Sequence, residues 1–323
     1  MEKLKRIMLS SLLGGVMVIA SACGGGENGE SNNKNSSGSS AEQLSGEVIM
    51  DGSSTVYPIA EAAAEEYMAE QPNVKVSVSS SGTGGGFEKF TKGETDISNA
   101  SRPIKDEEKQ AAADNGIEFQ EFQVAYDGLS VVVNKENDWV DYLTVDELKK
   151  MWIEDGKVKK WSDIRPGWPD EEIKFFSPGH DSGTYDYFDE VILDGKEIVK
   201  SAQLSEDDNV LVRGVTGDKN AIGYFGYAYY FENKDQLKVV PIDAGKGPVE
   251  PTHETIQKGE YTPLSRPLFM YVNTQSLREK PQVYDYMKFL LENVGDYAEE
   301  VGYVRLPDEK YQEQLEVLEG FKK

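Results

Sequence analysis

The fold of this chain is set by one stretch, EVIMDGSSTVYP at residues 47–58. Residues 47–50 predict a short buried strand, and the polar residues 51–55 predict the turn that follows it. Pro58 suits the first turn of a helix, because the amide hydrogen that proline lacks would have no intrahelical partner there. Apolar residues spaced by four over 59–67 give this helix one apolar face. The stretch therefore predicts a strand, a polar turn and a helix in succession.

The same pattern returns further along the chain. Valines alternate over 74–78 and lead into a Ser/Gly-rich turn at 79–86. An apolar run at 173–176 leads into SPGHDSGT at 177–184, and another short strand enters a polar turn within 95–103. Strands that alternate with helices predict an α/β fold, with these turns at the carboxyl ends of mainly parallel strands.

These turns could together form a site for a small anion. Each one ends where a helix begins, so its amides lack intrahelical partners and the helix dipole is positive there. Hydroxyl groups would add to these amides; they belong to Ser54, Thr55, Thr83, Ser101, Ser182 and Thr184. Arg102 offers a guanidinium for bidentate contact with an oxyanion. Turns that meet at one point predict a tetrahedral-anion site. The alternative for each single turn is a helix cap with no ligand.

The composition excludes several classes of function. A length of 323 residues predicts two domains. With 58 acidic and 34 basic residues, the formal net charge of −24 argues against a nucleic-acid partner and against docking on anionic lipid through a basic face. One cysteine excludes an intramolecular disulfide and a thiolate-rich metal site, and two histidines leave little for histidine-based catalysis. We therefore expect no metal, no cofactor and no acid–base chemistry.

Residues 1–22 have the features of a secretory signal peptide. Basic residues precede an apolar-to-small run at 7–20, which is too short for a comfortable membrane span. The run leads into ASAC at 20–23, which resembles a bacterial lipobox and implies cleavage before Cys23 and lipidation of that residue. The alternative is an ordinary signal peptide with an incidental cysteine. Residues 23–45 predict the lipidated cysteine and a flexible linker, because they are almost wholly small and polar.

Four motifs in this order resemble a known family. They are DGSSTVYP at 51–58, SGTGGG at 81–86, SPGHDSGT at 177–184 and DKNAIGYFGYAY at 218–229. With the lipobox, they are similar to those of the phosphate-binding lipoproteins of bacterial phosphate ABC importers. The resemblance runs from about Gly46 to the C-terminus and implies a type II periplasmic-binding-protein fold, in which two α/β lobes joined by crossing strands close over one phosphate.

The resemblance also implies a function and a location. The protein would be a monomer that is lipid-anchored to the outer face of the bacterial cell membrane. It would bind inorganic phosphate, use no cofactor, catalyse no reaction and deliver its ligand to a membrane permease. Such a protein is a receptor rather than an enzyme.

Some site residues are implied by position in the family motifs. Thr55 and Thr83 would offer hydroxyls and nearby amides from the first lobe. Ser182, Gly183 and Thr184 would bind the anion from the start of a helix in the second lobe. Together these residues would hold phosphate from both sides of the cleft.

Two positions depart from the family pattern. Ser101 stands where some members have an aspartate that accepts a proton from phosphate, and Pro178 stands where the same members have the binding arginine. Other branches of the family carry the residues seen here. We therefore expect Arg102 to replace the missing arginine.

Asp127 is the candidate for the missing proton acceptor. Phosphate near neutral pH carries a proton and sulfate does not, so a carboxylate in the site would favour phosphate. The alternative for Asp127 is a turn or an inter-lobe hydrogen bond. Asp51 and Asp181 are weaker candidates, which we expect to cap helices or to face solvent.

The lobes are expected to be formed by different parts of the chain. Residues 46–127 and 269–323 would form the first lobe, and residues 128–268 would form the second. The β-rich segments 129–134 and 268–273 are candidates for the strands that cross between lobes. Core strands within a lobe are the alternative for both segments.

Three other functions remain alternatives. A receptor for another tetrahedral oxyanion, such as sulfate or molybdate, would need the same turns. An exported phosphatase would need a metal cluster or an activated nucleophile, and neither is evident. A structural surface protein or adhesin would bind no phosphate at all.

Overall fold

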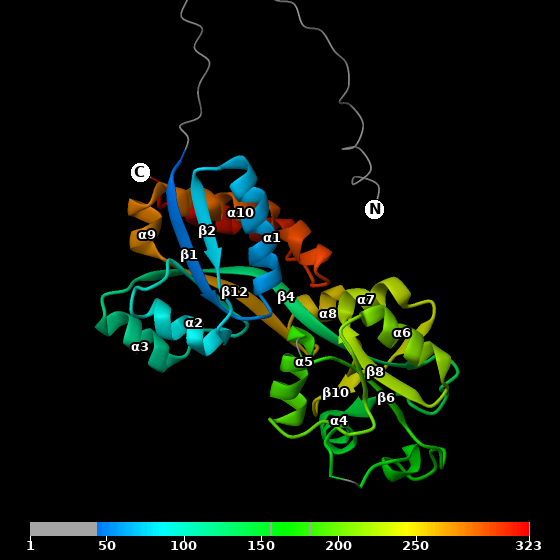
Figure 1. The fold of residues 1–323 in the computed structure, drawn as a ribbon. Coiled ribbons are helices and arrows are strands. Elements are labelled where there is room, and N and C mark those ends of the chain that lie inside the picture. The colour runs from blue at the N-terminus through cyan, green and yellow to red at the C-terminus, as the bar shows by residue number, and fades with distance from the viewer. Residues whose placement is uncertain (1–43, 156, 181, 323) are drawn as a thin grey trace, which may run out of the picture. The chain divides into compact units, whose positions relative to one another are not determined.

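The computed structural model describes residues 44–155, 157–180 and 182–322 (Figure 1). The predicted signal peptide, Cys23 and nearly all of the predicted linker lie outside the described residues. Within the described ranges, no helix combines the length and the apolar character that a membrane span requires.

The first sheet has parallel strands at one side. β1 (Gly46–Gly52) lies between β2 (Val74–Val78) and β3 (Ile97–Ala100) and is parallel to both. β12 (Ser265–Asn273) pairs antiparallel with β3 and then with β4 (Phe119–Asn134). The strand order is therefore β2-β1-β3-β12-β4.

Helices cover both faces of this sheet, and together they form what we call the first lobe (Figure 1). The helices are α1 (Tyr57–Glu70), α2 (Gly82–Phe90), α3 (Asp106–Asp114), α9 (Thr274–Glu279), α10 (Pro281–Glu300) and α11 (Asp308–Glu319). Residues of α1, α10 and α11 share one apolar core with the sheet, whereas α2 packs on the other face through Phe87 and Phe90. The apolar helix face predicted over 59–67 does pack against this core, because Ile59, Ala63 and Tyr67 are all buried.

The second lobe is built on the far half of β4. Beyond β4 the strand order is β8-β6-β7, and a further strand, β9, also pairs with β4. These strands are β8 (Ala221–Gly226), β6 (Lys174–Pro178), β7 (Gln203–Ser205) and β9 (Leu237–Val239). A separate small sheet contains β5 (Leu143–Thr144), β10 (Ile242–Asp243) and β11 (Pro248–Val249).

The helices of the second lobe pack around an aromatic core. They are α4 (Val145–Trp152), α5 (Gly183–Phe188) with a π-helical continuation (Asp189–Leu193), α6 (Asp208–Gly217), α7 (Tyr227–Asn233), α8 (His253–Gln257) and a 3₁₀ turn (Trp161–Asp163). The rings of Phe188 and Tyr224 stack with centroids 3.8 Å apart, and Trp152 meets both of them edge to face. This packing fixes α5 against the sheet.

The long strand β4 joins the two lobes. Its residues 119–128 pair with β12, and residues 129–134 pair with β8 and β9. The segment 268–273 lies in β12 within the first lobe. Segment 129–134 therefore lies in the sheet of the second lobe and segment 268–273 in the sheet of the first. The connection lies between them, where Asp127 of β4 is opposite Arg266 of β12.

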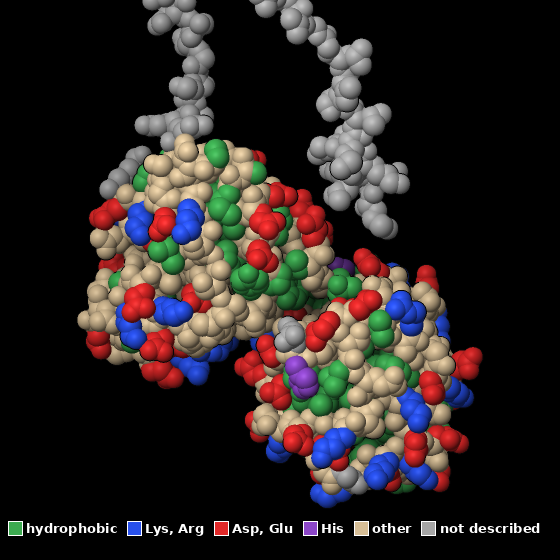
Figure 2. All heavy atoms as spheres, viewed as in Figure 1, with side chains coloured by type: hydrophobic (Ala, Val, Ile, Leu, Met, Phe, Trp, Pro, Cys, Tyr) green, Lys and Arg blue, Asp and Glu red, His purple; other side chains and the backbone are tan. Residues whose placement is uncertain are grey.

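The α/β fold with polar turns at the ends of parallel strands is confirmed, but the strands are not mainly parallel, because the long central strands β4 and β12 pair antiparallel with their neighbours. β1 and β3 run parallel and end at polar turns. β6 is parallel to β7 and β8, and it also ends at a polar turn. Acidic and basic side chains are interspersed over the face of the molecule seen in Figure 2, which shows no large basic patch.

Gly86 tests the close packing of α2 on β1. A Cβ atom at Gly86 would lie 2.5 Å from Gly52 Cα and 2.9 Å from the Asp51 carbonyl oxygen, so Gly86→Ala forces the helix away from the strand. We expect a loss of about 1–3 kcal/mol in the free energy of unfolding, measured by urea denaturation without ligand.

The control is Gly84→Ala in the same helix. A Cβ atom there would meet nothing within 4 Å, so this variant should be equally stable or gain about 0.5–1 kcal/mol. Equal stabilities for the two variants would contradict the close approach.

Candidate functional site

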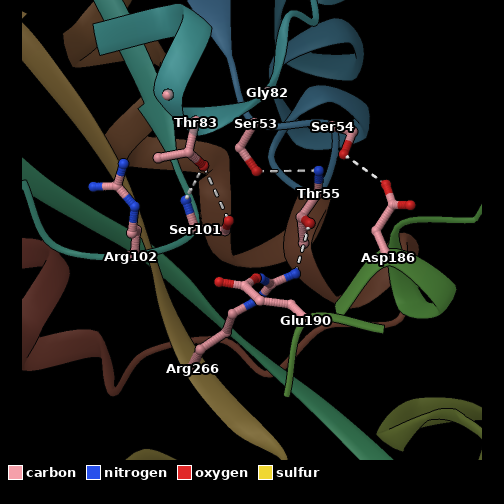
Figure 3. Close-up of a pocket in the computed structure, with 11 residues that line it drawn as sticks. Ser53, Ser54, Thr55, Gly82, Thr83, Ser101, Arg102, Asp186, Glu190 and Arg266 are labelled. Carbon is pink, nitrogen blue, oxygen red and sulfur yellow. Dashed lines mark hydrogen bonds and ion pairs between the residues drawn. The ribbon is translucent and has the colours of Figure 1, made fainter. Parts of the chain in front are cut away.

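One cavity lies at the carboxyl ends of the parallel strands of the first lobe and has a volume of about 270 Å³. It is lined by Ser53, Ser54, Thr55, Gly82, Thr83, Gly84, Ser101, Arg102, Asp186, Glu190 and Arg266 (Figure 3). Three predicted turns of the first lobe contribute to this lining. Asp186 and Glu190 come from α5 and its continuation in the second lobe, and Arg266 comes from the start of β12. The cavity therefore draws side chains from both lobes.

The turn after β1 is shaped by hydrogen bonds within the first lobe. Ser53 donates its amide to the Asn99 carbonyl oxygen at 2.9 Å, and the Thr55 amide donates to Ser53 Oγ at 3.2 Å. Thr55 is nearly fully buried, yet its hydroxyl reaches the cavity lining. Because α1 begins at Tyr57, this turn also lies at the positive end of a helix.

The start of α2 lies beside the turn after β3. Ser101 donates its amide to Thr83 Oγ1 at 3.2 Å, and the two hydroxyl oxygens are 3.1 Å apart. α2 begins at Gly82, so the amides of its first turn have no intrahelical acceptor. Amides and hydroxyls that converge in this way can bind an anion through neutral dipoles.

Arg266 is the central cation of the site and is not among the residues predicted from the sequence. Its Nη2 donates to Thr55 Oγ1 at 2.9 Å, and its Nη1 donates to Glu190 Oε2 at 3.1 Å. Its Nε donates to Asp127 Oδ2 at 3.3 Å, and the guanidinium lies 3.7 Å from the centroid of the Tyr187 ring. Only 11% of its side chain is exposed. Arg266 therefore contacts both lobes at once.

A sequence signal for Arg266 did exist. It is the single charged residue in the otherwise apolar and small stretch LSRPLFMYV at 264–272. A charged side chain at the start of a buried strand needs a partner. Arg266 could therefore have been proposed as a functional residue. Its partners, however, are 76, 139 and 211 residues away in the sequence.

Asp127 lies behind Arg266 and does not line the cavity. Its side chain is 1% exposed, and burial raises its pKa above the ordinary value, while the nearby Arg266 guanidinium opposes this increase. Its second oxygen, Oδ1, has no hydrogen-bond partner among the residues that the structure describes. In this geometry Asp127 makes the inter-lobe ion pair that was the alternative to its role as a proton acceptor.

Arg102 lines the cavity but its charge is already paired. Its Nη1 and Nη2 atoms each donate to a carboxylate oxygen of Glu108 at 2.8 Å, and the guanidinium lies 5.4 Å from the centroid of the Phe87 ring. Burial tends to raise the pKa of Glu108, but the hydrogen bonds from Arg102 outweigh it and hold that pKa below the ordinary value. Arg102 therefore reaches the cavity as half of an ion pair.

The predicted residues at the start of α5 lie beside the cavity. Ser182 Oγ accepts a hydrogen bond from the Thr184 amide at 3.2 Å, which caps the helix. A Cβ atom at Gly183 would lie 3.5 Å from Thr55 Oγ1, so the helix start is close to the first lobe. Of the predicted residues, Ser54, Thr55, Thr83, Ser101 and Arg102 line the cavity, whereas Asp127, Ser182, Gly183 and Thr184 do not.

Asp51 is neither exposed nor part of the cavity. It is 3% exposed, accepts hydrogen bonds from the Gly52 and Ser81 amides at 2.7 and 2.9 Å, and forms an ion pair with Lys89. Burial raises the pKa of Asp51, but these hydrogen bonds outweigh it and lower the pKa overall. Asp51 ties the turn after β1 to the start of α2. Asp181, the other weaker candidate, lies outside the described residues.

The described residues offer no evident metal centre. They contain no group of three or more His, Cys, Asp or Glu side chains placed to hold an ion. His253 Nδ1 lies 3.1 Å from the Tyr227 hydroxyl, and the ring of His180 packs on Tyr185. Neither histidine lines the cavity, so its chemistry is limited to hydroxyls, amides, carboxylates and guanidinium groups.

Comparisons with known proteins agree on one family. Residues 37–294 match the model of the PBP superfamily domain. The chain is 47% identical over 310 residues to the "Phosphate-binding protein PstS" of Staphylococcus haemolyticus, which covers 96% of this chain and 95% of that relative. The chain is also 47% identical to the relative of the same name from Staphylococcus saprophyticus. That match covers 94% of this chain and 91% of the relative.

Solved structures give the same result. A possible phosphate binding protein from Planctomyces limnophilus is 48% identical, with a TM-score of 0.83, over 87% of this chain and 100% of that one. An ABC-type phosphate transport receptor from Vibrio cholerae is 25% identical, with a TM-score of 0.62, over 80% of this chain and 100% of that one. The similarity covers the whole chain of both structures.

Replacement of Asp51 tests its role in shaping the site. We expect Asp51→Asn to lower the free energy of unfolding by about 1–3 kcal/mol at pH 7, because charge-assisted hydrogen bonds are lost. The pKa of Asp51 is lowered in the folded state, so its stabilisation is present above the unfolded pKa of about 4 and is lost as pH falls through the folded value. The difference from wild type should therefore shrink below about pH 4.

Asp138→Asn is the matched control, since that side chain is 84% exposed and should change stability little. Urea denaturation across pH measures both variants. A stability difference for Asp51→Asn that stays constant down to acid pH would contradict the ionised role.

Proposed function

Because this chain belongs to the PstS phosphate-binding proteins of the PBP superfamily, we propose that it captures inorganic phosphate between its two lobes and delivers it to an ABC-type phosphate importer. The chain has the type II periplasmic-binding-protein fold of that family. The observation that carries the proposal is the cavity in which three polar turns meet a nearly buried arginine. Such a site suits a small anion.

In this proposal the anion is held mainly by neutral groups. The free amides at the start of α2 and the hydroxyls of Ser54, Thr55, Thr83 and Ser101 donate to the phosphate oxygens. Arg266 supplies the guanidinium that contacts phosphate directly. Arg102 adds a partly neutralised charge at the side of the site, since Glu108 occupies its Nη1 and Nη2 atoms.

The second lobe completes the binding site when the cleft closes. Ser182, Gly183 and Thr184 at the start of α5 then donate their amides and hydroxyls to the anion. The closeness of Gly183 to Thr55 supports this role, because only a short movement separates the helix start from the first lobe. The Thr184 amide donates to Ser182 Oγ and holds that hydroxyl at the start of the helix.

The lobes are assigned to residues 46–127 with 269–323, and to residues 128–268. The apolar cores support this division. Phe122, Val124 and Ala125 share a core with α1, α10 and alternate residues of β12 from Leu268, whereas buried residues between Leu129 and Leu264 contribute to the cores of the second lobe. The connection at Asp127 and Arg266 lies between these cores.

The protein acts as a receptor and not as an enzyme. The relatives are named as binding proteins, and the lining has hydroxyls but no histidine to activate one of them. It is extracytoplasmic, and Cys23 carries the lipid that anchors it to the outer face of the cell membrane, with 24–45 as a linker. It works as a monomer that hands phosphate to the permease.

Arg266 tests the binding site directly. Calorimetry should show that the purified chain binds phosphate and that Arg266→Ala weakens binding by about 10- to 150-fold, because one charge-assisted bond contributes about 1.5–3 kcal/mol. Arg278→Ala is the control, since it removes the same charge from an exposed position on α9. An unchanged affinity in Arg266→Ala would refute its role, and absence of phosphate binding in wild type would refute the function.

Thr83 tests the contribution of neutral groups. Thr83→Val keeps the side-chain shape but removes a hydroxyl that lines the cavity, so we expect phosphate binding to weaken by about 10-fold or more. Thr91→Val is the control, because Thr91 lies at the other end of α2 and donates to the Glu88 carbonyl oxygen. If both variants bind phosphate equally, the hydroxyl of Thr83 has no part in binding.

A further inference from the structure

Two of the sequence motifs meet inside the second lobe. SPGHDSGT at 177–184 leads into the helix start that is proposed to bind phosphate, whereas no residue of DKNAIGYFGYAY at 218–229 lines the cavity. The first motif begins in β6, and β8 lies within the second. Because β6 and β8 are parallel neighbours in one sheet, the two motifs can contact each other through their side chains.

Tyr224 of β8 makes this contact with its hydroxyl group. Its hydroxyl oxygen forms a hydrogen bond of 2.7 Å with Ser177 Oγ, and Ser177 Oγ forms a second one of 2.9 Å with the Pro178 carbonyl oxygen. Tyr224 and Ser177 are both fully buried, so water cannot replace either partner. This hydrogen bond therefore fixes the end of β6, where the turn toward the helix start begins.

The ring of Tyr224 holds the other side of the same turn. Phe188 at the end of α5 stacks on this ring, with the centroids 3.8 Å apart and an angle of 14° between the planes. Trp152 packs edge to face against both rings and completes the contact. Residues 182–184 lie between the two attachments. One side chain thus holds the strand before these residues and the helix after them.

Hydrogen bonds continue from the end of β6 to the first turn of α5. The Ser182 amide donates to the Gly179 carbonyl oxygen at 3.1 Å, and the Thr184 amide donates to Ser182 Oγ at 3.2 Å. A site that is ordered before the ligand arrives loses less conformational entropy on binding and so binds more tightly. Loss of one attachment should therefore weaken the contacts that this turn makes to an anion.

We propose that Tyr224 is a positioning residue for phosphate binding, which holds residues 182–184 where they retain the anion once the lobes have closed. This inference rests on the proposed function. Tyr224 acts through the turn and not on the ligand, because it is fully buried and outside the cavity lining. The first lobe supplies most of the lining, so residues 182–184 act after the anion has been captured. Tyr224 therefore slows phosphate release and leaves phosphate association unchanged.

Tyr224→Phe tests this role, because it keeps the stacked ring and removes only the hydroxyl. We expect phosphate to leave the full-length variant about 2- to 10-fold faster, as for the loss of one neutral hydrogen bond, and the affinity to fall by the same factor. Release is measured by chasing radiolabelled phosphate with unlabelled phosphate, and affinity is measured by calorimetry. The association rate constant, which is the release rate constant divided by the dissociation constant, should stay unchanged.

Ser177→Ala should give the same result from the other side of the hydrogen bond. The double variant should release phosphate no faster than either single variant, because all three lose the same bond. Tyr286→Phe is the matched control. Tyr286 is equally buried but belongs to the core of the first lobe, where its hydroxyl donates to the Ala60 carbonyl oxygen at 3.4 Å. This control should release phosphate at the wild-type rate.

Each outcome decides the inference. An unchanged release rate in Tyr224→Phe overturns it, since a residue that only fills the core is replaced by phenylalanine without effect on binding. Equal acceleration in Tyr286→Phe overturns it as well, and so does an affinity that falls through slower association. Should Tyr224→Phe fail to fold, as judged by its melting temperature without ligand, Ser177→Ala decides by the same criteria. These results defeat this inference alone, whereas a wild type that binds no phosphate defeats the proposed function itself.

Discussion

The ion pair between Arg266 and Asp127 is the interaction on which the rest of the site depends. Both residues are nearly buried, and they lie opposite each other where β4 and β12 pair between the lobes. Neither charge could be buried alone without a large cost, so each holds the other in place. The guanidinium is then aimed at Thr55 in the first lobe and at Glu190 in the second. One buried pair thus sets the geometry of contacts from both lobes.

The rest of the site works without much positive charge. A net charge of −24 repels anions at long range, but helix starts and hydroxyls attract an anion over short distances. Buried close to the ligand, such dipoles are screened little by water or by distant carboxylates. The acidic surface and the anion site can therefore coexist in one chain.

Much of the fold and part of the site could be predicted from the sequence, because the signals were local. Strand, turn and helix follow each other within about twenty residues, so periodicity placed Thr55, Thr83 and Ser101 at strand ends that share one edge of a sheet. Contacts between distant segments had no local signal. The pairing of Arg266 with Asp127 depends on the register between β4 and β12. The two residues are 139 positions apart in the sequence.

Charged residues were harder to place than hydroxyls for a related reason. Arg102 is predicted to contact the anion, but a turn brings Glu108 back to it across a spacing of six residues, which is not helical. Asp186 and Glu190 are four residues apart and are typical of a solvated helix face, and each is exposed. This helix face lines a cavity only because residues of the first lobe lie opposite it. The function of a charge depends on its partners, and partners are a property of the fold.

The exposure of its two partners decides how Arg266 can respond to an anion. The Glu190 side chain is 62% exposed, so water can hydrate its carboxylate at once if an anion displaces it from the guanidinium. The Asp127 side chain is 1% exposed, and loss of Arg266 would leave a buried charge without a partner. In the proposed site, an arriving anion would therefore replace Glu190 and leave the pair with Asp127 intact. Because Glu190 belongs to the second lobe, the exchange of one carboxylate for the ligand changes the contacts between lobes at the same place where the ligand binds.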